Sequence, residues 1–334
     1  MHEKILLGQF YTRGNPFQYS RAQSWFRGIP NLSKLRIIEP FAGSNSIVAL
    51  VNSSVESLGP ENWESFDIHP EAIEANLVPE ITLNKRDTLE DFPTGFDVAI
   101  TNPPYLAKNS ATRKGMLVHF GDYQDTFEVA LHEMLSNCNW VAAIIPESFI
   151  TRKLFKDRLD AVISLNHEMF DDTEFPVCLA LFSPNSSSDF EIWRGEEFLG
   201  TRTNLNREVE KLLDGRAVIK PRFNAPTGQI GLIAIDNTTG ATIKFVEGST
   251  IPSEEIKVSS RSLTRIAIDS EEENFDSANL IAEANKILGS YRELSSDVFL
   301  TAFKGLRADN AYRRRIDWNT AGRILNKAAS NLIS

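Results

Sequence analysis

A polar side chain closes each of four successive apolar segments in the first third of the chain. These side chains are Glu39, Asp67, Asp87 and Asn102. Short apolar segments of this kind predict buried strands. Parallel strands present their carboxyl ends at one edge of a sheet, where open α/β sheets bind ligands. We therefore expect carboxylates and an amide at one binding edge, placed to accept hydrogen bonds from a flat, nitrogen-bearing ligand.

The fourth segment runs into Thr101-Asn102-Pro103-Pro104-Tyr105. The two prolines end the strand and stiffen the turn, and Pro103 pushes Asn102 toward extended geometry. The amide of Asn102 and the ring of Tyr105 are thereby held at the end of a strand, where the ring can stack on a planar substrate. An ordinary turn has the same composition, so the position behind three other strand ends decides the interpretation.

The turn after the first strand contains a single glycine, Gly43. A dinucleotide site would need Gly-x-Gly-x-x-Gly there to cradle a pyrophosphate. An acid after the second strand, Asp67, suits the vicinal hydroxyls of a ribose, because a carboxylate accepts two hydrogen bonds side by side. Glu39 could then face a cationic amino group. A nucleoside cofactor without phosphates fits this set and points to S-adenosyl-L-methionine.

The apolar segments alternate with helical patterns, which predicts a Rossmann-like α/β sheet. We expect seven strands at 35–38, 63–68, 81–84, 96–101, 140–145, 161–165 and 177–182, and helices at 20–27, 45–58, 70–77, 123–136 and 151–159. Too few residues separate the last two strands for a crossover helix, so the seventh should be antiparallel to the sixth. Residues 106–122 have no clear period and predict a surface loop.

A polar stretch at 184–189 is the best candidate for a linker. Beyond it the sequence predicts a hairpin at 230–235 and 241–246, a strand at 261–268, and helices at 280–288 and 320–332. These elements indicate a smaller α+β domain. The predicted organisation is therefore a catalytic domain at 1–189 and a second domain at 190–334.

The composition is that of a soluble globular protein, with 42% hydrophobic and 24% charged residues in 334. No apolar run approaches the ~20 residues of a membrane span, and the first residues lack the features of a signal peptide. Cys138 and Cys178 lie in apolar surroundings and are expected to be reduced thiols, which favours a cytoplasmic protein. The histidines have no metal-ligand spacing, so no metal site is expected.

The charge is unevenly distributed along the chain. The formal net charge is −10, which by itself argues mildly against a nucleic-acid partner. Residues 1–200 hold 16 basic and 28 acidic side chains, whereas residues 201–334 hold 19 and 17. Arg313, Arg314 and Arg315 are interleaved with Tyr312 and Trp318, which favours phosphate contact over a solvated helix start. Arg261 and Arg265 lie among hydroxyl side chains in a second candidate DNA contact.

Six spaced motifs resemble those of the amino-methylating DNA methyltransferases of the gamma arrangement, which include the Taq-type adenine-N6 enzymes. The motifs are Gly8-Gln-Phe-Tyr-Thr12, Glu39-Pro-Phe-Ala-Gly43, Phe66-Asp-Ile68, Arg86-Asp87, Asn102-Pro-Pro-Tyr105 and the hairpin from Glu174 to Phe182. They occur in the family's order and cover roughly residues 8–182. One departure is Asn45, where a second glycine is common in the family.

The resemblance implies a role for each matched residue. The cofactor S-adenosyl-L-methionine would be bound by Tyr11, Thr12, Glu39, Phe41, Ala42, Gly43, Asp67, Ile68, Asp87, Asn102 and Phe127. Within that set, Thr12 would hold the methionine carboxylate, Glu39 the amino group and Asp67 the ribose, with Ile68 and Phe127 against the adenine and Asp87 on its amino group.

The resemblance also implies the catalytic group. Asn102 and Pro103, followed by Pro104 and Tyr105, would accept the hydrogens of the target amino group, and Tyr105 and Phe175 would hold a base rotated out of the duplex.

The resemblance implies methylation of adenine N6 in double-stranded DNA, at a short recognition site read by the C-terminal part. A cognate restriction endonuclease that acts separately is a candidate partner. Cytosine N4 is an alternative target. Release-factor glutamine methylation and RNA-base methylation use the same tetrapeptide, but they do not need a basic-ended C-terminal domain of this size. A decayed methyltransferase kept as a DNA-binding module is the non-enzymatic alternative, and the intact Asn102, Tyr105, Glu39 and Asp67 argue against it.

Overall fold

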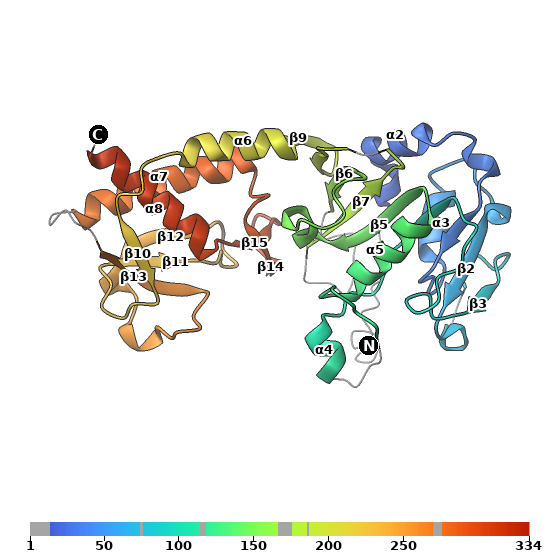
Figure 1. The fold of residues 1–334 in the computed structure, drawn as a ribbon, viewed down its shortest axis with the longest axis horizontal. Helices are drawn as coiled ribbons and strands as arrows, with labels where there is room; N and C mark the ends of the chain where they lie inside the picture. The colour runs from blue at the N-terminus through green and yellow to red at the C-terminus, as the bar shows by residue number, and fades with distance from the viewer. Residues whose placement is uncertain are drawn as a thin grey trace. The chain divides into compact units, whose positions relative to one another are not determined.

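The computed structural model describes residues 14–73, 76–113, 118–165, 176–185, 187–269 and 276–333. The chain divides into two compact units, Met1–Thr201 and Arg202–Ser334 (Figure 1). The predicted boundary at 189/190 lies twelve residues before this division. Each unit has its own buried core, so each is described by itself.

The first unit contains a nine-stranded sheet with the order β3-β2-β1-β4-β5-β7-β6-β8-β9. Its strands are β1 Ile37–Glu39, β2 Trp63–Asp67, β3 Leu83–Lys85, β4 Val98–Thr101, β5 Trp140–Pro146, β6 Leu159–Ser164, β7 Val177–Phe182, β8 Glu191–Arg194 and β9 Glu197–Thr201. Within the run β3-β2-β1-β4-β5, each strand pairs parallel with the next. Strand β7 is antiparallel to both β5 and β6, which confirms the predicted reversal.

The predicted count of seven strands is too low, because β8 and β9 extend the same sheet. Strand β8 pairs parallel with β6, and β9 returns antiparallel to β8. The stretch taken for a linker is therefore only the short connection to an edge hairpin. The strands of this hairpin are short, and Phe198 in β9 is 50% exposed. The apolar pattern of the sequence therefore does not reveal the hairpin.

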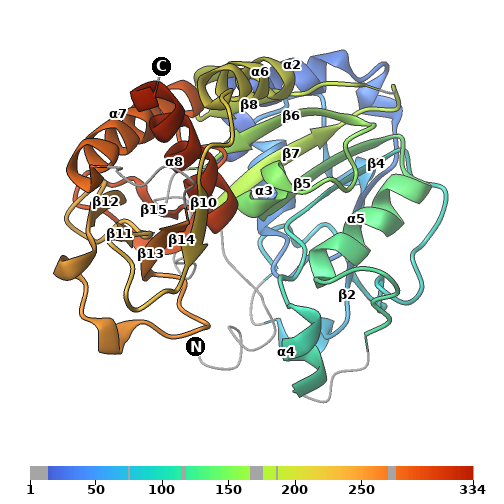
Figure 2. The ribbon, with the colours of Figure 1, turned by 60° about the vertical axis from the view of Figure 1, so that its left-hand side comes forward.

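Helices α2 Ser20–Gly28, α3 Ser46–Asn52, α4 Lys108–Arg113 and α5 Thr126–Asn137 belong to the first unit. Helix α5 begins where the Asp125 carboxylate accepts a hydrogen bond from the Phe127 amide, and it runs beside β5 (Figures 1 and 2). The predicted helix at 70–77 is only a 3₁₀ turn, Pro70–Ala72, within its described residues.

The predicted helix at 151–159 is wrong. The 3₁₀ segment Glu147–Thr151 ends there, and β6 already begins at Leu159. Phe155 lies between them in the left-handed region at φ 56°, which interrupts a right-handed helix.

The second unit pairs an antiparallel sheet with helices. Its strands are β10 Lys220–Phe223, β11 Ile230–Ile233, β12 Lys244–Glu247, β13 Leu263–Asp269, β14 Thr301–Leu306 and β15 Tyr312–Arg315, and its helices are α6 Arg202–Leu213, α7 Ser277–Ser295 and α8 Trp318–Ile333. The first four strands form a sheet in the order β10-β13-β11-β12, and the predicted hairpin of β11 and β12 is confirmed. Helices α7 and α8 bury apolar faces against this sheet (Figure 2).

Candidate active site

The sheet order places the four predicted strand ends side by side. Strands β3, β2, β1 and β4 are parallel neighbours, so their carboxyl ends meet at one edge. Asp67 ends β2, Glu39 ends β1 and Thr101 ends β4, while Asp87 follows β3 by two residues. The predicted common edge is therefore present, with acids from three strands next to the Asn-Pro-Pro-Tyr segment.

Glu39 is fully buried, and only one of its carboxylate oxygens has a hydrogen-bond donor among the described residues. Oε1 accepts from the Phe41 amide at 3.0 Å and from the Thr101 hydroxyl. Oε2 has no partner in the part of the chain that is described. Burial raises the pKa of Glu39 to about 8, and the Thr101 and Phe41 hydrogen bonds oppose that rise. An incompletely bonded buried carboxyl of this kind is suited to a cationic ligand group.

Asp67 ties the turn after β1 to the end of β2. Its Oδ2 accepts from the Gly43 amide at 3.0 Å and its Oδ1 from the His69 amide at 2.8 Å. The Ala42 amide also donates to the Phe66 carbonyl at 2.9 Å, so the turn is held from both sides. Gly43 has φ 48°, and a Cβ at that position would meet nothing within 4 Å. The turn thus leaves open space beside an acid whose oxygens still have acceptor capacity.

Asn45, the residue that departs from the family pattern, lies in the left-handed region at φ 60°. Asparagine adopts this conformation more readily than most residues, so the turn does not require a second glycine. Its side-chain Nδ2 donates to Asn76 Oδ1 at 2.9 Å, which joins the turn to the segment before β3. The substitution therefore keeps the turn geometry and adds a bond.

Asp87 and Ile68 lie on either side of the end of β2. The half-buried Asp87 accepts from the Leu89 amide at 3.1 Å, and Thr88 donates to the Pro40 carbonyl at 2.7 Å, which ties this loop to the turn after β1. Ile68 is 46% exposed although it is a large apolar residue. An exposed apolar side chain directly after Asp67 offers a surface for a flat ring.

The Asn-Pro-Pro-Tyr segment is irregular and follows the fully buried β4. The Tyr105 hydroxyl lies within hydrogen-bond distance of Asn102 Oδ1 and is 2.7 Å from the Ile144 carbonyl oxygen. The Tyr105 ring packs against the core of the first unit. The hydroxyl has a single hydrogen, so it can donate to only one of these acceptors at a time.

Two buried threonines that sequence reasoning missed bracket this segment. Thr101 precedes it and bonds to Glu39. Thr126, at the start of α5, donates to the Pro104 carbonyl at 2.5 Å and accepts from the Leu106 amide at 2.9 Å. Thr126 is 24 positions from Asn102, and no local motif marks it, so only the packing of α5 reveals the contact.

The remaining predicted residues of this site are not all placed at the edge. Tyr11, Thr12 and Phe175 lie outside the described residues. Phe127 is 1% exposed and lies beneath the Arg152 guanidinium, whose centre is 5.2 Å from the ring. This burial does not fit the expectation that Phe127 packs on a cofactor, and we leave it out of the proposed site.

The arginine run is a strand rather than a helix start, and much of it faces inward. Arg314 is 6% exposed, and its backbone amide is 3.3 Å from Asp236 Oδ2. Arg313 Nε donates to the Asp236 carbonyl at 2.6 Å, and its guanidinium lies over the Phe303 ring. Arg315, which is half-buried, pairs with Thr301 across the strands. The expectation of three adjacent phosphate contacts therefore does not fit Arg314, which is buried.

The two arginines of the second candidate DNA contact, Arg261 and Arg265, also differ in their surroundings. Arg265 donates to the Ile251 carbonyl at 2.6 Å and to the Pro226 carbonyl at 2.8 Å, so it holds two loops of the second unit. Arg261 is exposed in the loop before β13. Of this pair, Arg261 is the residue whose surroundings fit a contact with an external ligand.

No protein-family model and no curated protein matches the chain. Solved structures are similar to part of it. A type I restriction-modification methyltransferase subunit from Streptococcus thermophilus is 18% identical, over 56% of this chain and 47% of its own, with a TM-score of 0.40. A putative class I S-adenosylmethionine-dependent methyltransferase from Listeria monocytogenes is 13% identical over 55% of this chain and 65% of its own, with a TM-score of 0.41.

A putative RNA methyltransferase from Pyrococcus horikoshii is 16% identical over 55% of this chain and 90% of its own, with a TM-score of 0.38. The chain thus spans about half the length of the Streptococcus thermophilus subunit and two thirds of that of the Listeria monocytogenes protein. With TM-scores below 0.5, these likenesses do not define a function, which must come from the residues of the chain itself.

Two further searches of the described residues found nothing. None of the described helices has the length and apolar character to span a membrane. Within the same residues, no group of three or more histidine, cysteine, aspartate and glutamate side chains is placed to hold a metal ion.

Proposed function

We propose that the chain is an S-adenosyl-L-methionine-dependent methyltransferase that modifies the N6 amino group of adenine in a short duplex DNA sequence. The observation that carries this proposal is the buried Glu39, whose Oε2 has no donor among the described residues, next to the Asn102 segment on the neighbouring strand. A cationic amino group would supply the missing donor. The cofactor has such a group and also a ribose and an adenine.

The residues at the sheet edge fit that cofactor in chemical type. Glu39 would bind the amino group, Asp67 the ribose hydroxyls and Asp87 the adenine amino group, with Ile68 against the adenine ring. The open space beside Gly43 would leave room for the cofactor. We propose that Phe41 and Ala42 of this turn, together with Tyr11 and Thr12, also bind the cofactor.

When bound, S-adenosyl-L-methionine would supply an electrophilic methyl group and a thioether leaving group. Asn102 Oδ1 and the Pro103 carbonyl oxygen would accept the two hydrogens of the target amino group and so raise the electron density on its nitrogen. Methyl transfer would form the nitrogen–carbon bond as the carbon–sulfur bond breaks, and one proton of the amino group would leave to solvent. Tyr105 and Phe175 would hold the extruded base.

The second unit would contact the DNA, through Arg261, Arg315 and neighbouring side chains. Incubating plasmid DNA with the protein and cofactor labelled in the methyl group, followed by nucleoside analysis and sequencing, tests the function. We expect N6-methyladenine at one short sequence. N4-methylcytosine would change the target base, and label found only in RNA or protein would overturn the proposal. A separate endonuclease with the same recognition sequence would place the enzyme in a restriction-modification system.

We expect the substitution Glu39→Gln to weaken cofactor binding by about tenfold to a hundredfold, because a charge-assisted bond to the amino group is lost. Binding to the wild type should strengthen as the pH rises toward about 8, since the carboxyl must lose its proton to bind a cation. In the variant this rise should be absent. Titration calorimetry between pH 6 and 8 measures both effects.

Glu39→Gln should weaken cofactor binding but increase the stability of the fold at neutral pH. The folded state holds the Glu39 proton up to a pKa of about 8, whereas the unfolded chain releases it near 4.5. Between these values the folded state binds more protons, so the free energy of unfolding falls as the pH rises, by up to about 1.4 kcal/mol per pH unit. Glu39→Gln removes this loss. Glu64→Gln on β2 is the matched control, because Glu64 is partly exposed and pairs with the exposed Arg36 side chain. It should leave cofactor binding and the pH dependence of stability near wild type.

We expect Thr101→Val to shift the pH dependence of cofactor binding upward. The hydroxyl of Thr101 donates to Glu39, and this bond lowers the pKa of the carboxyl. Valine has nearly the same shape and no donor, so Glu39 should lose its proton at a higher pH. Thr101→Ser should restore the wild-type curve. An unchanged curve in Thr101→Val would contradict the proposed link between the two side chains.

A further inference from the structure

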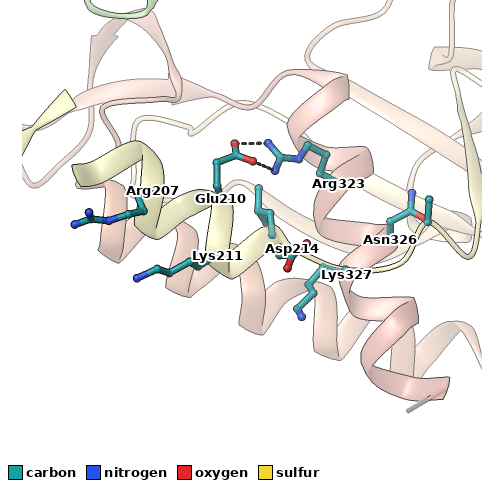
Figure 3. Close-up of a pocket in the computed structure, with 10 residues that line it drawn as sticks. Arg207, Glu210, Lys211, Asp214, Arg323, Asn326 and Lys327 are labelled. Carbon is teal, nitrogen blue, oxygen red and sulfur yellow. Dashed lines mark hydrogen bonds and ion pairs between the residues drawn. The ribbon is translucent and has the colours of Figure 1, made fainter. Parts of the chain in front are cut away.

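A pocket of about 540 Å³ lies in the second unit, between α6 and α8 (Figure 3). We call it the α6–α8 pocket. Its charged lining residues are Arg207, Glu210, Lys211, Asp214, Arg323 and Lys327. It lies outside the predicted DNA contacts, and it belongs to a chain segment that the candidate active site does not use.

Helical spacing brings four cations to this pocket. Arg207 and Lys211 are four residues apart on α6, and Arg323 and Lys327 are four residues apart on α8. Residues at this spacing lie one above the other on the same face of a helix. Helices α6 and α8 are in contact within the second unit, and both basic pairs line the same pocket.

The four cations differ in how they are already engaged. Arg323 donates to both carboxylate oxygens of Glu210, at 2.9 and 2.6 Å, as the dashed lines in Figure 3 mark. These bonds use two of its five N–H groups. Lys211 pairs with Glu208 at 2.9 Å, and Arg207 lies 3.6 Å from the same carboxylate.

The Lys327 side chain makes no hydrogen bond or ion pair within the described parts of the chain, and it lines the pocket. The existing pairs are exposed to solvent, with Lys211 64% and Glu208 44% exposed. Exposed pairs of this kind contribute little and exchange readily with other partners. The cations of the pocket are therefore available to a stronger anionic ligand.

The local charge favours an anion in spite of the acidic chain. The lining carries four cations against Glu210 and Asp214, a formal excess of two, and Glu208 on α6 reduces it to one. The whole chain carries −10. Arg313 is engaged by the Asp236 carbonyl and Arg314 is buried, whereas the basic side chains of this pocket lie at the surface of the second unit. Spaced lysine and arginine side chains suit successive phosphodiesters.

We propose that the α6–α8 pocket contacts the phosphodiester backbone of duplex DNA outside the sequence that is read. This inference rests on the proposed function for its choice of DNA as the ligand. The contact is independent of base identity, so it contributes to affinity and to register but not to the choice of sequence.

The test is the salt dependence of duplex binding by the full chain, with Lys211→Gln combined with Lys327→Gln. Each lost phosphate contact should reduce the slope of log K against log salt by about one, so the double variant should lose about two. Its affinity at 0.15 M salt should fall by roughly ten- to thirtyfold, equally for duplexes with and without the methylated sequence. The rate of methyl transfer at saturating DNA should stay at the wild-type value.

Two variants control for net charge. Lys34→Gln combined with Lys286→Gln removes the same charge from exposed positions that do not line the pocket, and it should leave the slope unchanged. Asp214→Asn removes a carboxylate from the pocket and should strengthen binding of every duplex. A wild-type slope in the Lys211 and Lys327 variant, or an equal loss of slope in the control, overturns the proposal.

The arms of the experiment separate other outcomes. Inorganic phosphate binding that depends on Lys327, together with an unchanged duplex slope, would assign the pocket to a free phosphate ligand and overturn the DNA contact. Methyl transfer to DNA with an unchanged slope rejects this inference and leaves the proposed function standing. A reduced slope without any methyl transfer supports the DNA contact and rejects the proposed function.

Discussion

Asn102→Ala is expected to reduce the rate of methyl transfer by about a hundredfold to ten-thousandfold while cofactor binding stays within a few fold of wild type. The Asn102 amide oxygen would accept a hydrogen of the target amino group, and positioned groups of this kind typically contribute rate factors of that size. Alanine removes the acceptor and leaves Glu39 and Asp67 untouched. Single-turnover transfer to a duplex, with calorimetric titration of the cofactor, measures both quantities.

Asn137→Ala is a suitable control for Asn102→Ala. Asn137 is the last residue of α5, and its side chain donates to the Glu133 carbonyl within the same helix. We expect its transfer rate to remain near that of the wild type. A transfer rate for Asn102→Ala close to wild type would rule out the proposed mechanism. A loss of cofactor binding equal to the loss of rate would instead place Asn102 in the binding of the cofactor.

Asp236→Asn is expected to lower the free energy of unfolding of the second unit by about 3–5 kcal/mol. Asp236 is 0% exposed and accepts from both terminal nitrogens of Arg292 at 2.9 Å, and Arg307 Nη1 lies 3.3 Å from it. Backbone amides of Thr242 and Ile243 also donate to it. Asparagine has nearly the same shape but no charge, so it leaves buried guanidinium groups incompletely compensated.

Burial alone would raise the pKa of Asp236, but the bonds from Arg292 hold it below the usual value. A lowered pKa means that this stability is present at neutral pH and is lost in acid, as the pH falls through the folded-state pKa. Chemical denaturation at several pH values, with hydrogen exchange in β11 and β15 as the probe of this unit, measures the change. Asp236→Asn should lack the fall in the free energy of unfolding that the wild type shows in acid.

Asp309→Asn is the matched control for this buried cluster. Asp309 pairs with the same Arg307 at 2.6 Å, but its side chain is 55% exposed. We expect a loss below about 1 kcal/mol, because solvent screens an exposed pair. Equal losses for the two variants would mean that burial of Asp236 does not determine the stability of this unit.

The order of strand ends was predictable because it rests on local patterns. Short apolar segments predict strands, and the residues that close them are read directly from the sequence, as for Glu39, Asp67 and Asn102. The reversal of β7 was predictable from the short connection before it. The edge hairpin of β8 and β9 was not, because its strands are short and partly exposed, and their pairing with β6 depends on the completed sheet.

The arginine run shows where local patterns stop being informative. Its spacing and aromatic neighbours indicate phosphate contact, yet Arg314 is buried and Arg313 donates to the backbone carbonyl of Asp236, which lies far earlier in the chain. A basic side chain can bind an external anion or acceptors within the fold, as Arg313 does. Only the packing of distant segments determines which of the two is close enough.

The sequence by itself determined the chemical types at the candidate site and their order: a carboxyl after β1, an acid after β2, an acid after β3 and Asn-Pro-Pro-Tyr after β4. The tertiary structure decided how these groups behave. Its burial of Glu39 raises the pKa of the carboxyl, the hydrogen bond from Thr101 partly offsets that rise, and Thr126 anchors Pro104. The physical reason is that residue types and strand periods are local properties, whereas burial and hydrogen-bond partners depend on segments that meet only in the folded chain.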